Sequence, residues 1–348
     1  MTTGINLYRD TFIEKERVIL ESGAFTVSSF RYNSGVEAVH IKNKKGEFIW
    51  LPFRGQQIWR AGFCGRELTM KSMFDEPAVS DEFGATYGCF MLHCGMTGVG
   101  NPTPEDTHPQ HGELPNILYD SAYIDVGEDK SGKFIIAGGK LDYKRAFSTY
   151  YIATSEIKLY EDGTVFDITM IIENKRSDPM EYLYLSHVNF RPIEGAKLVY
   201  NADCIKVHKN IPGNLSNEKA KALKDYMDKL EQEPSIQDVI DSKTQTYEPE
   251  IVFTFKYKAD ENGWAECLQV APDDSADYVA CELDKLPCGI RWIARTPHED
   301  AMGMLLPSTA EHLGYNYCKE TGQVKLLGAN ESITFHVVAG YLESVKDR

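Results

Sequence analysis

The sequence lacks the features of a membrane protein and of a nucleic-acid-binding protein. No apolar run approaches the roughly 20 residues that a membrane-spanning helix needs. Lys and Arg form no dense cluster, and 37 basic residues face 52 acidic ones, which gives the 348-residue chain a formal net charge of -15. Because basic side chains that meet phosphates supply most of the affinity for nucleic acid, this balance argues against such a partner. We therefore expect neither a membrane nor a nucleic acid as a partner.

Paired cysteine motifs and an apolar leader are also missing. The eight cysteines are spread widely, with no CxxC pair and no zinc-ribbon spacing, which favours buried thiols over disulfides or metal ligands. Residues 1–16 contain Arg9, Asp10, Glu14, Lys15 and Glu16, whereas a secretory signal needs an uninterrupted apolar stretch. We therefore expect a cytoplasmic location.

Short segments that alternate apolar and polar residues dominate the chain. This period of two is typical of strands with one buried face and one wetter face. Asp162-Gly163 between two such segments predicts a hairpin, because Gly accepts the positive φ of the turn. The clearest expected strands are Phe25–Tyr32, Phe48–Leu51, Tyr150–Tyr160, Thr164–Glu173, Tyr182–Phe190, Ile251–Tyr257, Ile290–Arg295 and Ile333–Val338.

One segment has clear helical spacing. Apolar residues recur at helical intervals from Ala220 to Leu230, Ser216 is suited to cap the free amides, and Pro234 follows the end of the pattern. A second short helix is expected over Ile236–Ile240. One helical excursion within many strands predicts a single all-β domain over residues 1–348, with a helical insertion at 214–241.

The segment Cys89–Asn116 has little periodicity and is rich in Gly, Pro and His. We expect a long ordered loop, and loops of this length in compact domains are often functional. Within it, His-Pro-Gln-His-Gly-Glu ends at Glu113. An imidazole exchanges protons near neutral pH, and Gly112 permits close approach to the backbone, so His111 is the stronger candidate there for chemistry.

Two further segments carry candidate ligand-binding residues. In a strand over Tyr182–Arg191, His187 and Asn189 share a face with Leu183 and Leu185, as expected where a strand runs from a core into a cleft. A structural histidine bonded to a neighbouring strand is the competing interpretation. Arg54, before a glycine, suits either an oxygen-rich ligand or a surface ion pair in a turn, and composition alone favours the ion pair.

Several motifs together resemble a known family. They occur in a fixed order over about residues 45–342: Leu-Pro-x-Arg-Gly-x-x-Ile at 51–58, the run Gly88–Gly100, His111-Gly112, Ser186–Phe190, Arg291-Trp292 and Leu327–Ser332. This set resembles the aldose 1-epimerase-like proteins, a branch of the galactose mutarotase superfamily. The resemblance implies an all-β supersandwich of two large antiparallel sheets.

The resemblance also implies a reaction and its residues. In mutarotases one His protonates the sugar ring oxygen while a carboxylate removes the proton of the anomeric hydroxyl. By this resemblance His187 is the acid and His111 a second, substrate-orienting histidine, and Arg54 and Asn189 bind hydroxyl groups. His93, Glu113 and Trp292 complete the expected substrate-binding set. The expected partner is a small-molecule sugar, no metal or organic cofactor is required, and a homodimer is one assembly left open.

One position departs from the family pattern. The family base is a Glu directly before Pro, where this chain has Leu306-Pro307. Leucine cannot accept a proton. Either anomeric catalysis is lost, or a nearby carboxylate replaces the base, with these candidates: Glu299, Asp300, Glu311 and Glu113.

Three functions therefore stay open. The first is a cofactor-free mutarotase. The second is a metal-assisted sugar isomerase or epimerase, whose Lewis-acid metal would be bound by residues from the set His93, His108, His111, Glu113 and His187. The third is a non-catalytic carbohydrate-binding protein with stacking surfaces from Tyr87, Trp59 and Trp292.

Overall fold

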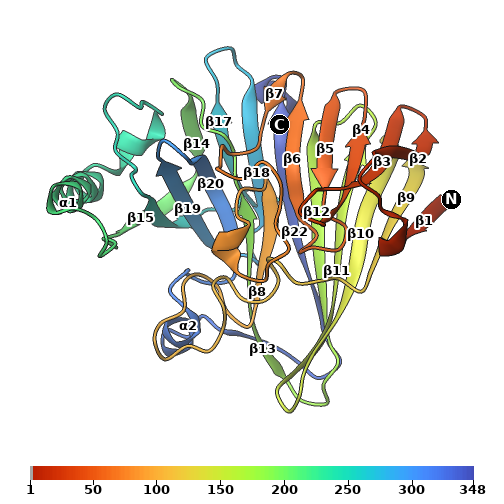
Figure 1. Ribbon diagram of the computed structural model, residues 1–348. Coiled ribbons are helices and arrows are strands. Elements are labelled where there is room, and N and C mark those ends of the chain that lie inside the picture. The colour runs from red at the N-terminus through yellow and green to blue at the C-terminus, as the bar shows by residue number, and fades with distance from the viewer. Residues whose placement is uncertain (1–2) are drawn as a thin grey trace.

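The computed structural model describes residues 3–348, except the side chain of Cys204. The expected domain of residues 1–348 thus extends two residues beyond the described part. Two large sheets pack face to face (Figure 1). Aromatic residues from both sheets meet in the core between them: the rings of Phe48 and Phe166 have their centroids 5.0 Å apart. The all-β sandwich expected from the sequence is confirmed.

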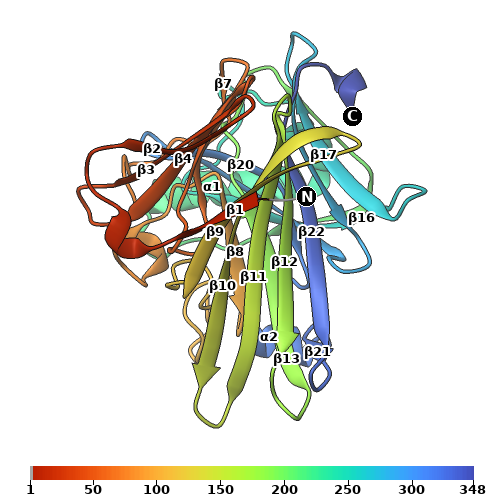
Figure 2. The same ribbon diagram turned by 90° about the vertical axis from the view of Figure 1, so that its right-hand side faces the viewer.

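The first sheet has nine strands, and its neighbouring strands are antiparallel. Figure 2 shows its long strands β10, β11, β12 and β22 side by side. In spatial order the strands are β1 (Thr3–Leu7), β9 (Ser121–Asp129), β10 (Gly132–Arg145), β11 (Thr149–Tyr160), β12 (Val165–Asn174), β22 (Ser332–Leu342), β18 (Ala276–Glu282), β17 (Trp264–Val270) and β14 (Lys197–Tyr200).

The second sheet has thirteen strands, of which eleven form one continuous order. These eleven are β15 (Ala202–His208), β16 (Ile251–Tyr257), β19 (Cys288–Arg295), β20 (Asp300–Ser308), β13 (Met180–Val188), β8 (Met91–Met96), β6 (Ile58–Phe63), β5 (Gly46–Trp50), β4 (Glu37–Lys42), β3 (Phe25–Arg31) and β2 (Arg17–Ser22). The short strands β21 (Lys325–Leu327) and β7 (Arg66–Glu67) pair with β13 and β6.

Helices are few and lie outside the sheets. The expected helix is α1 (Asn217–Gln232), and the side chain of Ser216 caps it by accepting a hydrogen bond from the amide of Lys219. Figure 1 places α1 at one end of the molecule, beyond β15. The remaining helices are α2 (Tyr315–Glu320) and the 3₁₀ turns η1 (Arg9–Thr11), η2 (Phe83–Ala85), η3 (Pro234–Asp238) and η4 (Val345–Asp347). A 3₁₀ turn, η3, thus takes the place of the short second helix.

The segment Cys89–Asn116 is not a loop throughout, which corrects the sequence interpretation. Its first part forms β8, which pairs with β13 and β6 near the middle of the second sheet. All six residues of β8 are buried. A strand that is covered on both faces has no polar side to alternate with its apolar side, so the period-two pattern is absent. The connection after β8 is the long loop that was expected.

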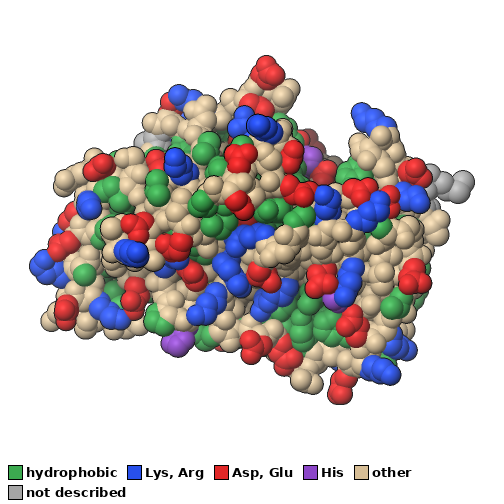
Figure 3. All heavy atoms as spheres, turned by 90° about the horizontal axis from the view of Figure 1, so that it is seen from above, with side chains coloured by type: hydrophobic (Ala, Val, Ile, Leu, Met, Phe, Trp, Pro, Cys, Tyr) green, Lys and Arg blue, Asp and Glu red, His purple; other side chains and the backbone are tan. Residues whose placement is uncertain are grey.

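One face of the molecule is mixed in charge. On the face in Figure 3, acidic and basic side chains are interspersed. Within residues 3–348, no helix combines the length and the apolar character that crossing a bilayer would require.

Candidate functional site

A cavity of about 370 Å³ opens over one half of the second sheet, at the strands β16, β19, β20 and β13. Its floor is formed by side chains of β13, β16, β19 and β20, namely Leu185, His187, Val252, Ile290, Trp292, Ala294 and Leu306. Its rim comes from five connections between strands, which contribute Met73, Phe74, Phe83, Gly84, Tyr87, Gly100, Asn101, Gln110, His111, Pro249, Glu250, Thr296, Glu299 and His312. Ligand pockets commonly have this size and this mixture of apolar walls and a few polar groups.

His187 lies on the cavity floor near the end of β13, and only 4% of it is exposed. Its Nδ1 lies 2.7 Å from Oδ1 of Asn189. Burial lowers the pKa of His187 to about 4, although the hydrogen bond to Asn189 acts in the opposite direction. The imidazole is therefore neutral at pH 7.

The amide of Asn189 is held in one orientation. Its Nδ2 donates to the carbonyl oxygen of Cys89 at 3.1 Å, so its Oδ1 faces His187. The hydroxyl of Tyr87 also donates to this Oδ1, at 3.1 Å. Since Oδ1 can only accept, the hydrogen-bond network assigns the proton of neutral His187 to Nδ1. The lone pair of Nε2 is left for the cavity.

His111 approaches the same cavity from the connection after β8. Its backbone has φ of 60°, and Gly112 follows with φ of 75°. A Cβ atom on Gly112 would collide with the carbonyl oxygens of Gly95 and Gly98. The backbone amide of His111 donates to Gly100 at 2.9 Å, and its carbonyl accepts from Gly95 at 2.8 Å. The loop thus holds a non-glycine residue in the left-handed region, a strained conformation that is often found at functional sites.

The ring of His111 has its own hydrogen-bond polarity. The amide of Gly100 points at His111 Nδ1 at 3.4 Å. Burial, with His187 and His312 nearby, keeps the pKa of His111 well below its usual range, so this ring is neutral too. A neutral ring that accepts at Nδ1 carries its proton on Nε2.

The two imidazoles meet inside an aromatic cluster. Their ring centroids are 5.4 Å apart, with the rings at 76°. Phe83 lies 4.7 Å from the ring of His111, whereas Tyr87 and Trp292 lie 5.7 and 5.6 Å from that of His187. The fold therefore brings together the two histidines that the sequence singled out.

Two carboxylates line the cavity. Oε2 of Glu250 accepts a hydrogen bond from the indole Nε1 of Trp292 at 2.5 Å. Oε2 of Glu299 accepts from the hydroxyl of Thr296 at 2.7 Å. Both side chains are partly buried and fixed at one end by these bonds, so each can orient a hydroxyl group of a ligand.

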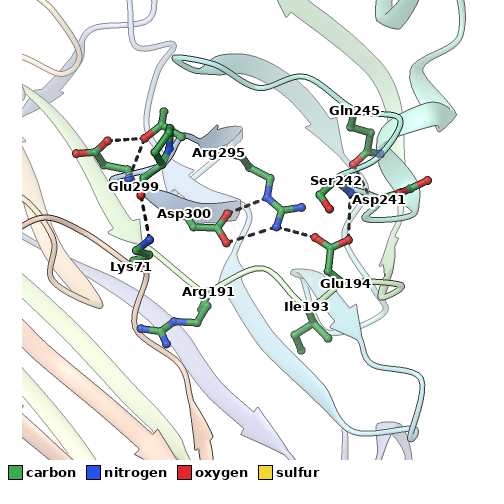
Figure 4. A network of polar contacts seen from close by, with 12 residues as sticks. Lys71, Arg191, Ile193, Glu194, Asp241, Ser242, Gln245, Arg295, Glu299 and Asp300 are labelled. Carbon is green, nitrogen blue, oxygen red and sulfur yellow. Dashed lines mark hydrogen bonds and ion pairs between the residues drawn. The ribbon is translucent and has the colours of Figure 1, made fainter.

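An ion-pair network fixes the turn that carries Glu299 (Figure 4). Arg295 bonds to Asp300 at 2.8 Å and to Glu194 at 2.7 Å, while Lys71 donates to the carbonyl of Pro297 at 2.9 Å. These contacts connect the turn between β19 and β20 to segments that are distant in the sequence. The rim of the cavity is therefore braced on this side.

Several residues expected to bind substrate lie outside the cavity. His93 is fully buried between the two sheets, where Nδ1 bonds to the hydroxyl of Tyr184 at 2.7 Å and Nε2 to that of Ser155 at 2.9 Å. Burial lowers the pKa of His93 to about 3. Asn189 lies beneath His187 instead of on the cavity surface.

Arg54 and Glu113 have structural partners. The guanidinium of Arg54 donates to the carbonyl of Asn116 at 2.6 Å and to Asp81 at 2.8 Å, so it joins two connections that form the rim. Glu113 accepts from the amide of Thr97 at 3.1 Å and from the hydroxyl of Tyr151 at 2.7 Å. Of the expected substrate-binding residues, Trp292 does line the cavity.

Leu306 is buried in the cavity floor, so hydrocarbon occupies the position at which the resemblance to mutarotases implies a base. Among the four carboxylates considered as replacements, Glu299 reaches the cavity. Asp300 is paired with Arg295, and Glu311 contacts Lys206 at 3.4 Å.

Of the three aromatic residues considered for stacking, Tyr87 and Trp292 line the cavity, while Trp59 is fully buried in the core.

Sequence reasoning missed Glu250 and His312. Glu250 precedes β16, and it reaches the site because Val252 is paired with Trp292 across β16 and β19. His312 follows β20 with no motif around it. To predict that either residue reaches the cavity, one would need to know which strands are paired. Period-two alternation predicts strands but does not specify their pairing.

The described part of the chain contains no group of three or more His, Cys, Asp and Glu side chains arranged to hold a metal ion. His93 and His108 of the expected metal set both point elsewhere: the Nε2 of His108 faces Asp106 at 3.6 Å and is buried. The donor set therefore does not fit the metal-assisted alternative.

A larger hollow, of about 740 Å³, lies near the hairpin tips and includes Arg145, Arg176 and His108. Arg176 is paired there with Asp178. Since neither His111 nor His187 lines this hollow, we assign the site to the smaller cavity.

Comparisons with known proteins agree with this architecture. A protein from Klebsiella pneumoniae that carries the provisional name aldose 1-epimerase has a TM-score of 0.84 at 17% identity, over 99% of this chain and 93% of that chain. A galactose mutarotase-like protein from Clostridium acetobutylicum has a TM-score of 0.59 at 14% identity, over 91% and 98%. A provisionally named aldose 1-epimerase from Escherichia coli K12 has a TM-score of 0.51 at 11% identity, over 98% and 99%.

At these identities the likeness establishes the fold, and the expected resemblance to galactose mutarotase-like proteins is confirmed at that level. No curated protein matches the sequence. The family model described as Domain of unknown function (DUF4432) matches residues 33–340. Because this match spans most of the chain, the protein belongs to the DUF4432 family.

Proposed function

We propose that this protein is a carbohydrate isomerase of the aldose 1-epimerase type, which interconverts the anomers of a monosaccharide without a cofactor. One observation carries the proposal: His111 and His187, far apart in the sequence, meet at 5.4 Å inside a cavity of about 370 Å³. Proton transfer at one sugar ring requires two such groups within reach of adjacent oxygens.

The cavity walls suit a sugar. The rings of Tyr87 and Trp292 offer faces for the apolar C–H surface of a pyranose. The carboxylates of Glu250 and Glu299 and the amides of Asn101 and Gln110 can bond to hydroxyl groups. Apolar walls with a few placed polar groups are the usual basis for binding such a ligand.

The two imidazoles have complementary roles. His187 presents an unprotonated Nε2, because its Nδ1–H is bonded to Asn189. His111 presents an Nε2–H, because its Nδ1 faces the amide of Gly100. One ring can therefore accept a proton while the other donates a hydrogen bond.

The reaction starts when Nε2 of His187 accepts the proton of the anomeric hydroxyl. The C1–O5 bond then breaks, its electron pair passes to O5, and C1–O1 becomes the carbonyl of the open-chain aldehyde. His111 donates a hydrogen bond to the developing O5 alkoxide, which receives the proton back from the His187 imidazolium. Rotation about C1–C2 and the reverse steps give the other anomer.

This assignment reverses the starting role that the resemblance implies for His187, which there is the acid. It also accounts for Leu306, since no carboxylate is needed as the base. Glu250 and Glu299 then serve to bind hydroxyl groups.

Saturation-transfer NMR between α and β anomers, over a panel of hexoses and pentoses, tests the proposal. We expect accelerated exchange for at least one sugar, and a fall of roughly 10²- to 10⁴-fold in the enzymatic rate in His187→Gln, the range that a proton-transferring group contributes. The matched control is His298→Gln, which changes an exposed histidine outside the cavity and should keep the wild-type rate. Absence of acceleration for every sugar would overturn the proposal, and sugar binding without exchange would indicate the carbohydrate-binding alternative.

A further inference from the structure

A second cavity, of about 160 Å³, adjoins the first. Four residues line both: Asn101, Glu250, Val252 and His312. The second cavity is completed by His208, Asn210, Met227 and Leu313. Since a water molecule needs roughly 10–15 Å³ of such space, the second cavity has room for a ligand group of many atoms.

The polar groups of the second cavity are built for an uncharged ligand. The rings of His208 and His312 lie 4.7 Å apart at 82°. His208 is held by the hydroxyl of Thr254 at 2.6 Å from Nε2. Burial lowers the pKa of His208, and it lowers that of His312 to about 3, so both rings are neutral at pH 7. An anion there would face the carboxylate of Glu250 with no cationic imidazole to offset it.

His312 is poised between the two cavities. Within the described chain its Nδ1 is buried and has no hydrogen-bond partner. A buried polar atom without a partner is costly, and a bound hydroxyl group would satisfy it. The amides of Asn101 and Asn210 supply further donors and acceptors around the same space.

One wall of the second cavity comes from the helical insertion. Met227 lies on α1, is 1% exposed, and lines this cavity but not the first. With Val252 and Leu313 it gives the cavity an apolar part beside the polar groups. The combination of an apolar wall and neutral polar groups matches the two surfaces of a sugar ring.

We propose that the two cavities form one binding site, in which the first holds the sugar ring that reacts and the second holds an uncharged, hydroxyl-bearing substituent of that sugar, such as the second ring of a reducing disaccharide. The inference rests on the proposed function for the identity of the ligand. The anomeric hydroxyl stays free for His187, and the substituent is attached at another carbon of the reacting ring.

Calorimetry with the full chain tests this inference. Glucose, galactose and xylose are compared with cellobiose, maltose, galactobiose and xylobiose, so that each disaccharide has its own reducing-end sugar as reference. We expect at least one disaccharide to bind about tenfold more tightly than its reference. Asn210→Trp, which fills the second cavity from an exposed position, should remove this gain and leave the Kd of the monosaccharide unchanged.

A second variant and a control complete the design. Met227→Phe narrows the same cavity from α1 and should act in the same direction. The control is Lys221→Trp, which introduces a tryptophan, as Asn210→Trp does, but on the exposed side of α1. It should change neither the Kd of the monosaccharide nor that of the disaccharide. The inference is overturned if every disaccharide binds no better than its reference, or if Asn210→Trp weakens both ligands equally.

The two proposals fail in different ways. Disaccharide binding that Asn210→Trp removes, without anomer exchange by NMR, contradicts the proposed function and supports the two-part site. Exchange of monosaccharides with no gain for any disaccharide contradicts the two-part site alone. Absence of both exchange and binding contradicts both.

Discussion

A single amide decides which nitrogen of His187 faces the cavity. Asn189 is oriented by its bond to the carbonyl of Cys89, and it accepts the Nδ1 proton of His187 at 2.7 Å. Such a partner fixes the tautomer of a functional histidine. Asn189, expected from the sequence to bind a hydroxyl group, is by this geometry a positioning residue.

Replacing this amide by a carboxylate should move the pH dependence of the reaction. In the wild type, the pKa of His187 is lowered to about 4, so kcat/KM should rise with pH through about 4 and stay level towards pH 8. In Asn189→Asp the nearby negative charge stabilises the imidazolium and raises the pKa, so this rise should move to higher pH. His111, Tyr87 and Trp292 lie around the same ring in both proteins, so the shift reports the substitution.

NMR exchange rates from pH 3.5 to 8 measure the effect. Asn201→Asp, an exposed position outside the cavity, is the matched control and should keep the wild-type profile. A profile that is the same in Asn189→Asp and the wild type would contradict the assigned role of His187.

The carboxylates of the cavity should matter less than the imidazole. Because Glu250 and Glu299 are proposed to bind hydroxyl groups, and a glutamine can still bond to a hydroxyl, Glu250→Gln and Glu299→Gln should raise KM and each reduce kcat by no more than about tenfold, which corresponds to roughly one ordinary hydrogen bond. His187→Gln should reduce kcat far more. If either Gln variant is as inactive as His187→Gln, that carboxylate is the base and the two-imidazole mechanism is wrong.

At the scale of elements, the connection after β8 has to hold His111 in place. His111 and Gly112 are both left-handed, and the space beside Gly112 is occupied by backbone oxygens. The position of the His111 imidazole therefore depends on Gly112, although Gly112 has no side chain that could take part in the reaction.

Gly112→Ala should displace this connection. Alanine is strained at φ of 75° and its Cβ would meet Gly95 and Gly98. We expect a loss of more than about 1 kcal/mol in the free energy of unfolding, and a decrease of roughly 10- to 100-fold in kcat from the misplaced imidazole. Urea unfolding and NMR exchange measure the two effects.

The control is Gly213→Ala, where an added Cβ meets no atom within 4 Å. It should leave stability and rate near the wild-type values. A Gly112→Ala protein with wild-type kcat would show that the loop conformation is not needed for the reaction.

The clearest sequence patterns belong to elements with one wet face. The hairpin of β11 and β12 alternates buried and partly buried residues along almost its whole length, and α1 has four buried side chains at helical spacing. β8 was missed because it is covered on both sides. Burial on both faces weakens the pattern on which such predictions depend, although β13, with eight of its nine residues buried, was still predicted.

At the scale of the whole molecule, neutral buried histidines connect stability to pH. Burial lowers the pKa of five histidines, namely His93, His111, His187, His208 and His312. The hydrogen bond to Asp167 raises the pKa of His336. For a histidine with a lowered pKa, the unfolded chain binds a proton near pH 6.5 that the folded chain does not bind. Each one therefore reduces stability as the pH falls below about 6.5, and His336 has the opposite effect.

Acidification from pH 7 to 5 should thus lower the free energy of unfolding. The slope is at most about 1.4 kcal/mol per pH unit for each histidine that stays neutral in the folded state. Urea unfolding at pH 7, 6 and 5 measures it. His93→Gln should be less stable at pH 7 but have a smaller slope than the wild type. A free energy that does not change over this range would contradict the account.

The composition of the site was only partly predictable from the sequence. His111 and His187 were found because each lies in a segment whose residue types change abruptly. His93 was misplaced in the expected set because it differs from His187 only in facing the other side of the sheet, where Ser155 and Tyr184 enclose it. Strand register decides which side a residue faces, and a one-residue shift reverses it.

Separate parts of the chain supply the reacting groups and the wall of the second cavity. The imidazoles come from β13 and the connection after β8, whereas Met227 comes from a helix inserted between β15 and β16. Relatives with a shorter or longer insertion at this point would differ in the length of ligand they accept and keep the same proton chemistry. The insertion thus offers evolution a means of changing selectivity independently of catalysis.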